Sequence, residues 1–585
     1  MPAASRTVLN RRLLARMAIL ALYAALALAA TWPLAQAPAR TLPTGGVQTA
    51  TVPLFNLWTI WWNADRLRHG FRGYWNAPIF HPVRDSFAFS EPQPTTILVA
   101  PIIWLTGSRV LAYNVYLWLS LVLNAAMALR LLRRVGVRPL PAVGGGAAML
   151  LLPIVHWQLD VLQLVPLWGI LWTWIALVKT SRRPTLLHGA EYGAAFGITF
   201  LTCGHQGLFL AVLTAAAAWV LPRQWLSVRT WSAALAAIVV AAVLIVPVAA
   251  RLRHAAKEND FTRTPEIVAQ LSAEPGDYTC PSGKQLIDLG RGTARPFWSL
   301  SPGWIKLGLA VIGAALGLSR RRGRRWTAFL LITAVLAYFL SLGPNLYLGQ
   351  WQPWWTLTHI VPGFSQVRNV FRFAFFVQMA VVLLAVQGVQ GLCLLDRRLL
   401  AKQSWRYAGG TGIVLLALAA LVETRPDGPN IATAPDAGAN SGWIRFVREA
   451  TPAGRAIACL PVAGSNHMED YEVTTRWMYF GTFHHVPLVD GYSGFFPGQH
   501  FEIRDALNRA PFAESTLQRL ADAGAEFLLV DRAALSDLPA APFRTGSIAL
   551  EPVFADSLGI DIYRIRSVGD PPKMQNPATT NTSEP

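Results

Sequence analysis

The segment TWSAALAAIVVAAVLIVPVAA, residues 230–250, contains no charged side chain. A helix needs about 20 apolar residues to cross the hydrocarbon core of a bilayer, where only a helix or a closed barrel satisfies every backbone polar group. A membrane barrel would show strands of about ten residues with alternating polarity, and this sequence has no such series. The segment therefore predicts a transmembrane helix.

Similar apolar segments recur along the chain. Hydrophobic residues make up 53% of the sequence and charged residues 14%, against about 45–50% and about 25% in soluble domains. The segments predict a mainly α fold, a polytopic helical membrane bundle of about eleven transmembrane helices. Besides residues 230–250, they are 17–34, 111–129, 139–155, 161–178, 189–203, 207–222, 304–319, 326–342, 373–395 and 407–422.

The chain has a net charge of +19, but the positions of its basic residues argue against a nucleic-acid partner. Basic residues gather in short groups after every second apolar segment, and short loops rich in Lys and Arg remain on the cytoplasmic side of a membrane. The pattern predicts an N-terminus inside, with residues 35–95 and the chain after 423 outside. The groups are Arg6/Arg11/Arg12/Arg16, Arg130/Arg133/Arg134/Arg138, Lys179/Arg182/Arg183, Arg223/Arg229, Arg320/Arg321/Arg322/Arg324/Arg325 and Arg397/Arg398/Lys402/Arg406.

After Pro426 the composition becomes that of a soluble domain. The order of predicted strands and helices indicates a small α/β fold. We therefore expect a transmembrane domain over 1–422 with an outer loop at 35–95, an extracytoplasmic α/β domain over 423–568, and a disordered tail over 569–585. The expected strands are 455–461, 526–531 and 560–565, and the expected helices are 441–450 and 500–523.

The outer loop carries three acidic residues, Asp65, Asp85 and Glu91, among many aromatic ones. A carboxylate beside a membrane can take a proton from an acceptor hydroxyl, or bind a metal that neutralises a phosphate leaving group. Asp65 has the alternative of pairing with a neighbouring arginine on an interfacial helix. Glu91, between a serine and a proline just before the chain re-enters the membrane, is the preferred candidate.

Two polar turns are predicted at the outer ends of membrane helices. His156 and Asp160 are four residues apart, so on a helix they would share a face and could bind a metal or pass a proton. They are too few for a zinc site, which needs three or four ligands, and a simple polar turn is the alternative. His205 and Gln206 form the second turn, and convergence of both turns on the outer loop would create one pocket.

Arg368 and Arg372 lie at the outer mouth of a membrane helix, on the side that should be poor in arginine. Guanidinium groups bind phosphate oxygens through two hydrogen bonds. The two side chains could therefore hold an anionic lipid-linked donor. The alternative is that they reach the phosphates of ordinary lipid headgroups.

The segment HHVPLVDGYSGFFPGQH, residues 484–500, is rich in His, Gly and aromatic residues. Carbohydrate-binding surfaces combine aromatic rings with polar groups in this way. The alternative is a glycine-rich turn packed by its own rings.

Several stretches together resemble a group of bacterial polytopic membrane proteins related to GT-C glycosyltransferases. The first are FNLWTIWWNADRLRHG, NAPIFHPVRDSFAFSEPQ and APIIWLTGSRVLAYNVYLWLS, and further stretches are HWQLDVLQLVPLW (156–168), HIVPGFSQVRNVFRF (359–373) and PLVDGYSGFFP (487–497). GT-C enzymes move a sugar from a polyprenyl-phosphate carrier to an acceptor, with inversion, using an acidic residue of the first outer loop. Relatives carry Gly-Asp-Pro where this chain has Thr51-Val52-Pro53, so Val52 replaces one acid, whereas Glu91 matches the second acidic motif.

The resemblance implies an inverting glycosyltransferase that acts in cell-envelope assembly, on the outer face of the bacterial inner membrane. Glu91, with Asp85, would be the base or metal ligand, and a divalent metal, not identified by the sequence, would be the cofactor. Arg368 and Arg372 would bind the donor phosphate. His156 and Asp160, in the first of the two predicted polar turns, would support them. The expected partners are a lipid-linked sugar donor and membrane lipid. The alternative, favoured by Val52, is a non-catalytic assembly partner or lipid-linked glycan carrier with a degenerate site.

Overall fold

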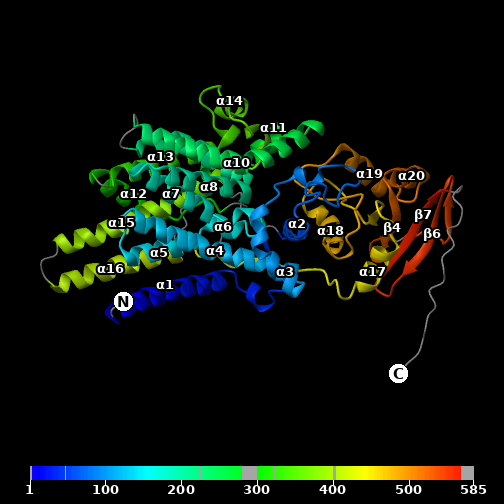
Figure 1. Cartoon of the computed structure of the whole chain (residues 1–585), viewed down its shortest axis with the longest axis horizontal. Helices are drawn as coiled ribbons and strands as arrows, with labels where there is room; N and C mark the ends of the chain where they lie inside the picture. Colours follow the sequence, from blue (N-terminus) through cyan, green and yellow to red (C-terminus); the bar gives the residue numbers. More distant parts are fainter. Residues whose placement is uncertain are drawn as a thin grey trace. The chain divides into compact units, whose positions relative to one another are not determined.

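The computed structural model describes residues 3–46, 48–222, 227–279, 299–321, 323–399, 403–535 and 537–567. Two compact units make up the chain (Figure 1). The membrane unit comprises Met1–Tyr74 and Phe87–Ala434, and the C-terminal unit comprises Trp75–Ser86 and Pro435–Pro585. The predicted disordered tail, residues 569–585, lies outside the described residues.

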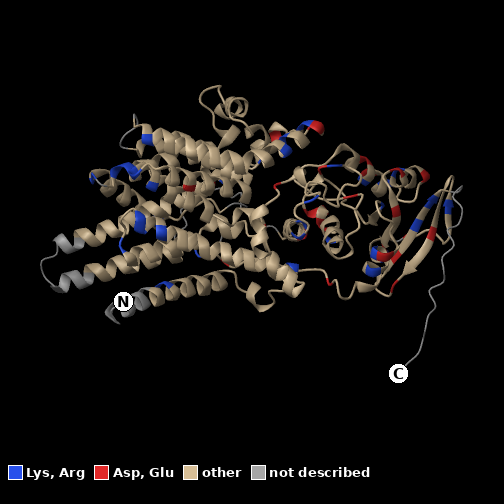
Figure 2. Ribbon diagram, viewed as in Figure 1, with Lys and Arg blue, Asp and Glu red and all other residues tan. Residues whose placement is uncertain are grey.

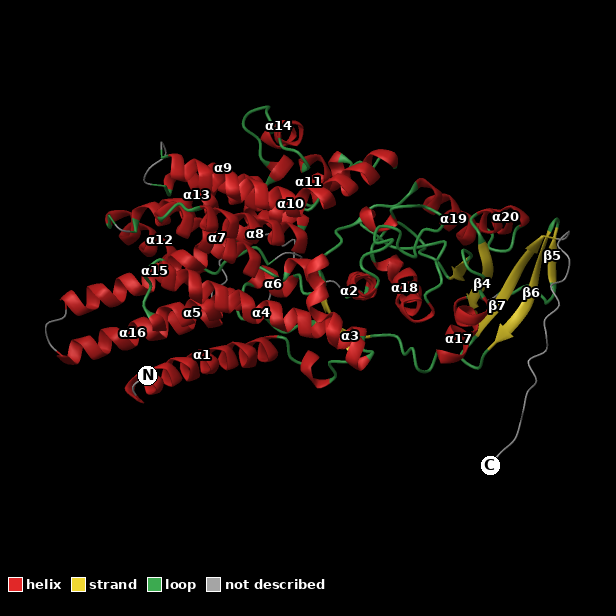
Figure 3. Cartoon of the chain, in the orientation of Figure 1, coloured by secondary structure: helices red, strands yellow, loops and turns green. Residues whose placement is uncertain are grey.

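Each of the apolar segments predicted from the sequence coincides with a helix of the membrane unit (Figure 3). In the described part of the chain, six segments are helical, long and apolar enough to cross a membrane: Leu13–Ala30, Arg109–Arg134, Pro139–Trp157, Leu162–Arg182, Val228–Glu258 and Val370–Leu395. Three of the other predicted spans contain shorter apolar helices, at Gly204–Val220, Trp304–Ser319 and Gly409–Val422. The helices are α1 (Ala3–Ala30), α2 (Thr51–Arg68), α3 (Ala100–Thr106), α4 (Arg109–Arg134), α5 (Pro139–Leu150), α6 (Pro153–Trp157), α7 (Trp168–Arg182), α8 (Leu186–Thr202), α9 (Gly204–Ala217), α10 (Val228–Glu258), α11 (Pro265–Gln270), α12 (Trp304–Ser319), α13 (Arg324–Ser341), α14 (Pro353–Ile360), α15 (Ala374–Leu399) and α16 (Gln403–Val422).

Small residues let neighbouring membrane helices approach closely. A Cβ atom at Gly189 of α8 would lie 2.0 Å from the carbonyl oxygen of Ala233 on α10, and one at Gly193 would lie 2.2 Å from that of Ala237. Lipid tails provide no hydrophobic drive between helices, so such close packing supplies much of the association energy. The contact fixes α8, whose C-terminal end leads directly to the candidate site.

Several basic groups lie together at one end of the bundle (Figure 2). The guanidinium of Arg182 donates to the carbonyl of Arg134 (3.0 Å), and that of Arg325 donates to Pro222 (2.7 Å). These bonds join the ends of α4 and α7, and of α13 and the segment after α9. The other end of α4 therefore faces the opposite side of the bundle.

That opposite end is built around the first turns of α4. Asn114 donates to the carbonyls of Pro38 and Thr41, both at 2.8 Å, and the Tyr113 hydroxyl donates to Leu159 (3.2 Å). A short two-stranded sheet lies beside it, β1 (Thr41–Gly45) with β2 (Asn430–Thr433), paired antiparallel. The segments predicted to lie outside the membrane thus meet at one end of this unit.

The C-terminal unit contains a five-stranded sheet of order β3-β4-β7-β6-β5. The strands β3 (Ala456–Leu460) and β4 (Ala525–Asp531) are parallel, and β4–β7, β7–β6 and β6–β5 are antiparallel. The first two and β7 (Ile560–Ser567) were predicted, whereas β5 (Phe543–Thr545) and β6 (Ile548–Ala555) were not. The helices are α17 (Ser441–Ala450), α18 (Glu472–His484), α19 (Gly498–Arg509) and α20 (Glu514–Asp522).

The predicted single helix over 500–523 is wrong, because two helices occupy this range. Pro511 stands between α19 and α20, and a proline restricts the residue before it and ends helices.

Part of the predicted outer loop packs with the C-terminal unit. The backbone N–H of His81 donates to Leu488 (2.9 Å), and the N–H of Leu488 donates to Pro78 (3.1 Å). The segment Trp75–Ser86 therefore contributes backbone hydrogen bonds to the C-terminal unit, although it lies far from it in the sequence.

Candidate functional site

Helix α2 holds the two loops that carry the candidate acids. Its buried residues Asn56 and Asn63 are seven positions apart, so they lie on the same face of the helix. The side-chain amide of Asn63 donates to the carbonyl of Pro92 (2.8 Å), next to Glu91, and that of Asn56 donates to the carbonyl of Asp160 (3.1 Å). One polar face within an aromatic helix thus positions both acidic loops.

The Glu91 carboxylate lies against the junction of α8 and α9. Its Oε1 accepts a hydrogen bond from the backbone N–H of His205 (3.0 Å) and lies 2.5 Å from His205 Nδ1. A Cβ atom at Gly204 would stand 3.2 Å from Oε1, so glycine permits the close approach. The first turn of α9 favours a negative charge at this point. Glu91 Oε2 is buried and has no hydrogen-bond partner among the described residues.

The two acids have opposite electrostatic environments. Burial alone would raise the pKa of Glu91, but the His205 ring and backbone, together with the Arg372 guanidinium, hold it below its usual range. Burial raises the pKa of Asp160 to about 7, with Arg372 opposing the rise. Asp160 is 4% exposed, and its Oδ1 has no partner within the described part of the chain. Near neutral pH Glu91 is ionised and Asp160 can both release and accept a proton.

Arg372 connects these acids. It lies in a short turn at Val370–Phe373 that leads into α15, within electrostatic range of Glu91, Asp160 and Arg368. Its Nε atom is buried without a hydrogen-bond partner in the described structure. The site therefore contains a guanidinium whose donors are available beside an ionised carboxylate and a protonatable one.

Aromatic stacking fixes the turn that carries Arg372. The ring of Phe373 stacks on that of Phe209, with centroids 3.7 Å apart, and the Phe209 ring contacts the His205 ring edge-on at 6.4 Å. The arginine and the partner of Glu91 are thus positioned by one stack of rings.

Three side chains at this site could hold a divalent metal. The ligand atoms of Glu91, Cys203 and His205 all lie within 4.8 Å of one another. Oxygen, sulfur and nitrogen donors suit a metal such as zinc better than magnesium, which prefers oxygen ligands alone. The residues fit a metal ion, and the unpartnered Oε2 of Glu91 provides a further donor atom.

Comparison with known proteins identifies the architecture. No family model and no curated protein matches the chain. The archaeal oligosaccharyltransferase AglB of Archaeoglobus fulgidus, solved with an inhibitory peptide and a dolichol-phosphate, superposes with a TM-score of 0.51 at 13% identity, over 88% of this chain and 69% of that chain. The apo form of the Archaeoglobus fulgidus oligosaccharyltransferase gives 0.53 at 14% identity, with the same coverage. The chain has a GT-C-like fold.

A third structure, the arabinofuranosyltransferase AftD from mycobacteria, gives a TM-score of 0.48 at 13% identity, over 93% of this chain and 41% of that chain. The resemblance predicted from the sequence is confirmed at the level of the GT-C-like fold, and the chain is a multi-pass membrane protein. At these identities the comparisons describe the fold alone.

The structure brings together only part of the residues predicted for this GT-C-like site. Glu91, Asp160, Arg368 and Arg372 belong to one electrostatic cluster of the membrane unit. Asp85 belongs to the C-terminal unit, where its backbone N–H donates to Asn76 Oδ1 (2.9 Å). The two acids predicted to act together are therefore in different units.

The remaining candidates have separate structural contacts. His156 is buried in α6, where its Nε2 lies 3.0 Å from the carbonyl oxygen of Leu150. Asp65 accepts a hydrogen bond from Arg66 Nε (2.7 Å), which confirms the alternative that it pairs with a neighbouring arginine. The second turn lies against the outer loop, because His205 contacts the Glu91 carboxylate. The amides Asn56 and Asn63 were missed, although two asparagines seven apart in an apolar run could have indicated them.

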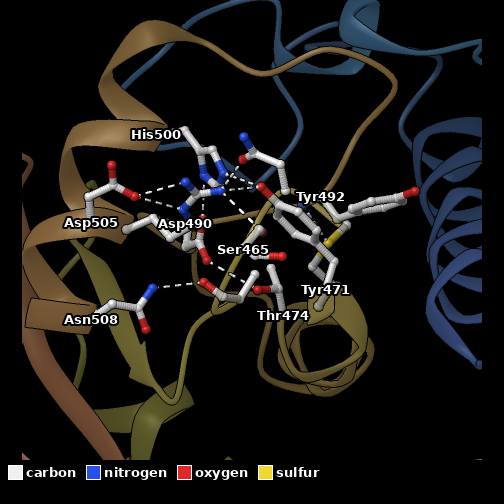
Figure 4. Close-up of polar contacts among 12 residues, drawn as sticks. Ser465, Tyr471, Thr474, Asp490, Tyr492, His500, Asp505 and Asn508 are labelled. Carbon is white, nitrogen blue, oxygen red and sulfur yellow. Dashed lines mark hydrogen bonds and ion pairs between the residues drawn. The ribbon is translucent and has the colours of Figure 1, made fainter. Parts of the chain in front are cut away.

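The segment 484–500 forms a packed polar cluster in the C-terminal unit (Figure 4). The His500 ring is fully buried, and its Nδ1 lies 2.7 Å from Asp490 Oδ1. The Tyr471 hydroxyl lies 3.1 Å from His500 Nε2 and accepts from Arg504 (3.0 Å), which also donates to Asp505. The ring of Phe496 stacks on His500 at 4.7 Å. These contacts favour the alternative of a turn packed by its own rings.

Proposed function

We propose that the chain is a membrane glycosyltransferase that moves a sugar from a polyprenyl-phosphate donor to a cell-envelope acceptor, on the outer face of the bacterial inner membrane. The observation that carries the proposal is the juxtaposition of Glu91, Asp160 and Arg372 at the end of the bundle opposite the basic groups. The GT-C-like fold supports it, since a structure with this fold was solved with a dolichol-phosphate bound.

Asp160 is the proton acceptor in this reaction. The acceptor hydroxyl oxygen attacks the anomeric carbon from the face opposite the phosphate and gives its proton to the Asp160 carboxylate. The bond between that carbon and the phosphate oxygen breaks, and the polyprenyl phosphate leaves with the electron pair. A pKa of about 7 suits this role, because a general base works best when its pKa lies near the operating pH. Back-side attack inverts the anomeric centre.

Arg372 and Arg368 bind the phosphate and stabilise the charge that develops on it. Guanidinium donors that are already in place need no reorganisation during the reaction, and this type of stabilisation is usually the largest single contribution to catalysis. Glu91, which stays ionised, keeps the Arg372 side chain charged and aligned. A metal held by Glu91, Cys203 and His205 would supply further Lewis-acid stabilisation of the phosphate.

Asp160 also offers a replacement for the acid that Val52 displaces. Val52 and Asn56 are four residues apart on α2, so they share a face. Asn56 donates a hydrogen bond to the carbonyl of Asp160. The loop that carries Asp160 is therefore held one helical turn from Val52, the position at which relatives carry aspartate. We infer that the carboxylate has moved from α2 to the neighbouring loop.

Asp85 and His156 have smaller roles in the proposal. Asp85, the second predicted catalytic acid, belongs to the C-terminal unit and stays a prediction, and His156 would support the Asp160 loop from within the bundle. The competing function is a non-catalytic assembly partner or lipid-linked glycan carrier, and the observation that favours it is Val52.

Envelope glycan composition separates the two functions. A deletion strain is complemented with the wild-type chain, with Glu91→Gln, and with the exposed control Glu258→Gln. The proposal expects Glu91→Gln, expressed at the wild-type level, to leave the glycan of the deletion strain, whereas the control restores the normal glycan. Normal glycan in strains that carry Glu91→Gln and in strains that carry Asp160→Asn would establish the non-catalytic function instead.

A further inference from the structure

The segment between α13 and α15 carries no charged side chain. Residues 342–367 contain no Asp, Glu, Lys or Arg, although such residues are normally frequent where a chain faces water. The same stretch holds Tyr347, Trp351, Trp354 and Trp355. Tyr and Trp are enriched where a protein meets the boundary between lipid and water.

One side of this segment packs on the membrane unit. The Trp354 ring is buried, with its centroid 5.2 Å from that of Phe364. The Phe364 centroid lies 6.3 Å from that of Phe373, directly before α15. The Gln352 side chain donates to the carbonyl of Pro344 (2.7 Å). The segment is therefore held in a defined position against the bundle.

The other side of the segment is also apolar, and it is exposed. Its large side chains are 54–69% exposed, at Tyr347, Leu348, Trp351 and Ile360. On α13, Val335 and Phe339 are exposed and four residues apart, so they share a face of the helix that precedes the segment. Helix α14 projects beyond the outline of the other helices of the membrane unit (Figure 1). Among the described residues, nothing covers this apolar surface.

The polar groups of the segment are satisfied by short-range hydrogen bonds. The backbones of Leu348 and Trp351 exchange two, of 2.9 and 3.3 Å. The Trp351 indole donates to the Thr356 hydroxyl, and the Trp355 indole donates to Gln352 Oε1, both at 3.0 Å. A segment that satisfies its own groups can enter a poorly hydrated region without losing hydrogen bonds.

The chemistry of this surface fits lipid better than a soluble protein. Interfaces between proteins have a polar rim around their apolar centre, whereas residues 342–367 supply no charged group to such a rim. The chain is a multi-pass membrane protein. The surface also follows the exposed apolar face of α13, so it continues the apolar exterior of the bundle.

From these observations, we infer that residues 346–360 insert into the interfacial layer of the bilayer without crossing it, at the end of the bundle that carries Arg372. The exposed apolar surface contacts phospholipid at the level of the headgroups and the upper acyl chains, while Trp354 anchors the segment to the bundle. The inference is independent of the proposed transferase activity, because it rests on the exposed surface and on the membrane character of the chain.

A fluorescent label on one residue of this surface tests the inference. Leu348→Cys is labelled with an environment-sensitive dye, and the full chain is placed in phosphatidylcholine nanodiscs. Cys280→Ser and Cys393→Ser provide the background, which must itself take up no dye, and the buried Cys203 and Cys459 are retained. Leu558→Cys, at an exposed leucine of the C-terminal unit, is the matched control.

Two quenchers report where each label lies. An interfacial segment lies about 5–10 Å deep in the headgroup and acyl boundary. A doxyl group high on the acyl chain should therefore quench the label at 348 about twofold more than a doxyl group near the chain end. Aqueous iodide should quench the label at 558 strongly and the label at 348 weakly.

A charged substitution shows whether the apolar surface causes the insertion. Ile360→Asp should raise iodide quenching of the label at 348 about twofold, because a carboxylate is costly to bury in lipid. Leu558→Asp, the matched control, should leave that label unchanged. The membrane-spanning helices keep each variant in the nanodisc, so the label reports the segment alone.

The possible results separate lipid from the other environments. Strong iodide quenching at 348 without doxyl quenching would show a segment that faces water and would overturn the inference. Protection from both quenchers would replace lipid by a second copy of the chain. Quenching that is the same with and without Ile360→Asp would contradict insertion through the exposed apolar surface.

Discussion

Two carboxylate–histidine pairs occur in this chain, one in each unit, and they differ in what surrounds them. Glu91 and His205 lie 2.5 Å apart in the membrane unit, and Asp490 and His500 lie 2.7 Å apart in the C-terminal unit. Around the first pair, Glu91 Oε2 and Arg372 Nε are buried without partners in the described structure. Around the second pair, Thr474, Tyr471 and stacked rings occupy the neighbouring positions. His500 Nδ1, although 2.7 Å from Asp490 Oδ1, makes no hydrogen bond of good geometry within the described structure.

The comparison shows how the same pair of groups can serve binding or stability. Buried polar groups are normally satisfied, and an unsatisfied one indicates a function or a missing ligand. The pair in the membrane unit keeps free donors and acceptors beside the guanidinium groups of Arg368 and Arg372, as a site for an anionic substrate requires. The pair in the C-terminal unit is packed among Tyr471, Thr474 and stacked rings, and a small cavity lies beside Asp490.

The largest effect is expected at the proton acceptor. Asp160→Asn should lower the rate of sugar transfer by about 10²–10⁴-fold, the usual contribution of a general base, without a comparable loss of lipid binding. The exposed Asp260→Asn serves as the control. A transfer assay on purified protein checks this, and a loss below about threefold would remove Asp160 from the mechanism.

The pH dependence of transfer follows from the same carboxylate. The base must be ionised to act, so the rate should rise with pH through about 7 and level off above it. Ionisation of Glu91 should cause no second change of rate in this pH range, because the pKa of Glu91 lies below its usual value. A rate that stays constant from mildly acidic to mildly alkaline pH would contradict this assignment.

Breaking the pair in the C-terminal unit should reduce stability and leave the donor site intact. Asp490→Asn removes the partner of a fully buried histidine, and such changes lower the free energy of unfolding by about 3 kcal/mol. Thermal unfolding of the purified chain measures the loss, and the affinity of the folded fraction for a short polyprenyl phosphate such as farnesyl phosphate should stay within about twofold of wild type. Unchanged unfolding with lost lipid affinity would assign this cluster to the ligand instead.

Loosening the Glu91 loop should give a moderate effect. Asn63→Ala removes the amide that bonds to Pro92, and leaving such carbonyls unsatisfied costs about 1–3 kcal/mol. We expect about tenfold slower transfer, because Glu91 is less well positioned. Asn430→Ala, at a partly buried amide on β2, is the matched control and should retain most of the activity.

The smallest effect is expected at the position where this chain departs from its relatives. If Asp160 has taken over the role of the missing acid, Val52→Asp should change the transfer rate by less than about threefold, because only one carboxylate accepts the proton. A large gain in rate would show instead that the wild-type site is impaired by Val52.

The sequence was sufficient for the membrane fold, because helix length and charge placement are set locally by the bilayer. It also proposed Glu91, Asp160 and Arg372 one by one as candidates. Their convergence depends on Asn56 and Asn63, which bond to loops far away in the sequence, and no local pattern encodes such partners. For the same reason the sequence could not show that Asp85 lies in Trp75–Ser86, a segment of the other unit.

The most direct test of the catalytic role of Glu91 measures thermal stability and envelope glycan composition for one variant, Glu91→Gln. Glu91→Gln keeps a side-chain oxygen for the His205 N–H and removes only the charge. The chain should then unfold within a few degrees of wild type, while the envelope glycan stays that of the deletion strain. A wild-type glycan in cells that carry Glu91→Gln would contradict a catalytic role for this pair.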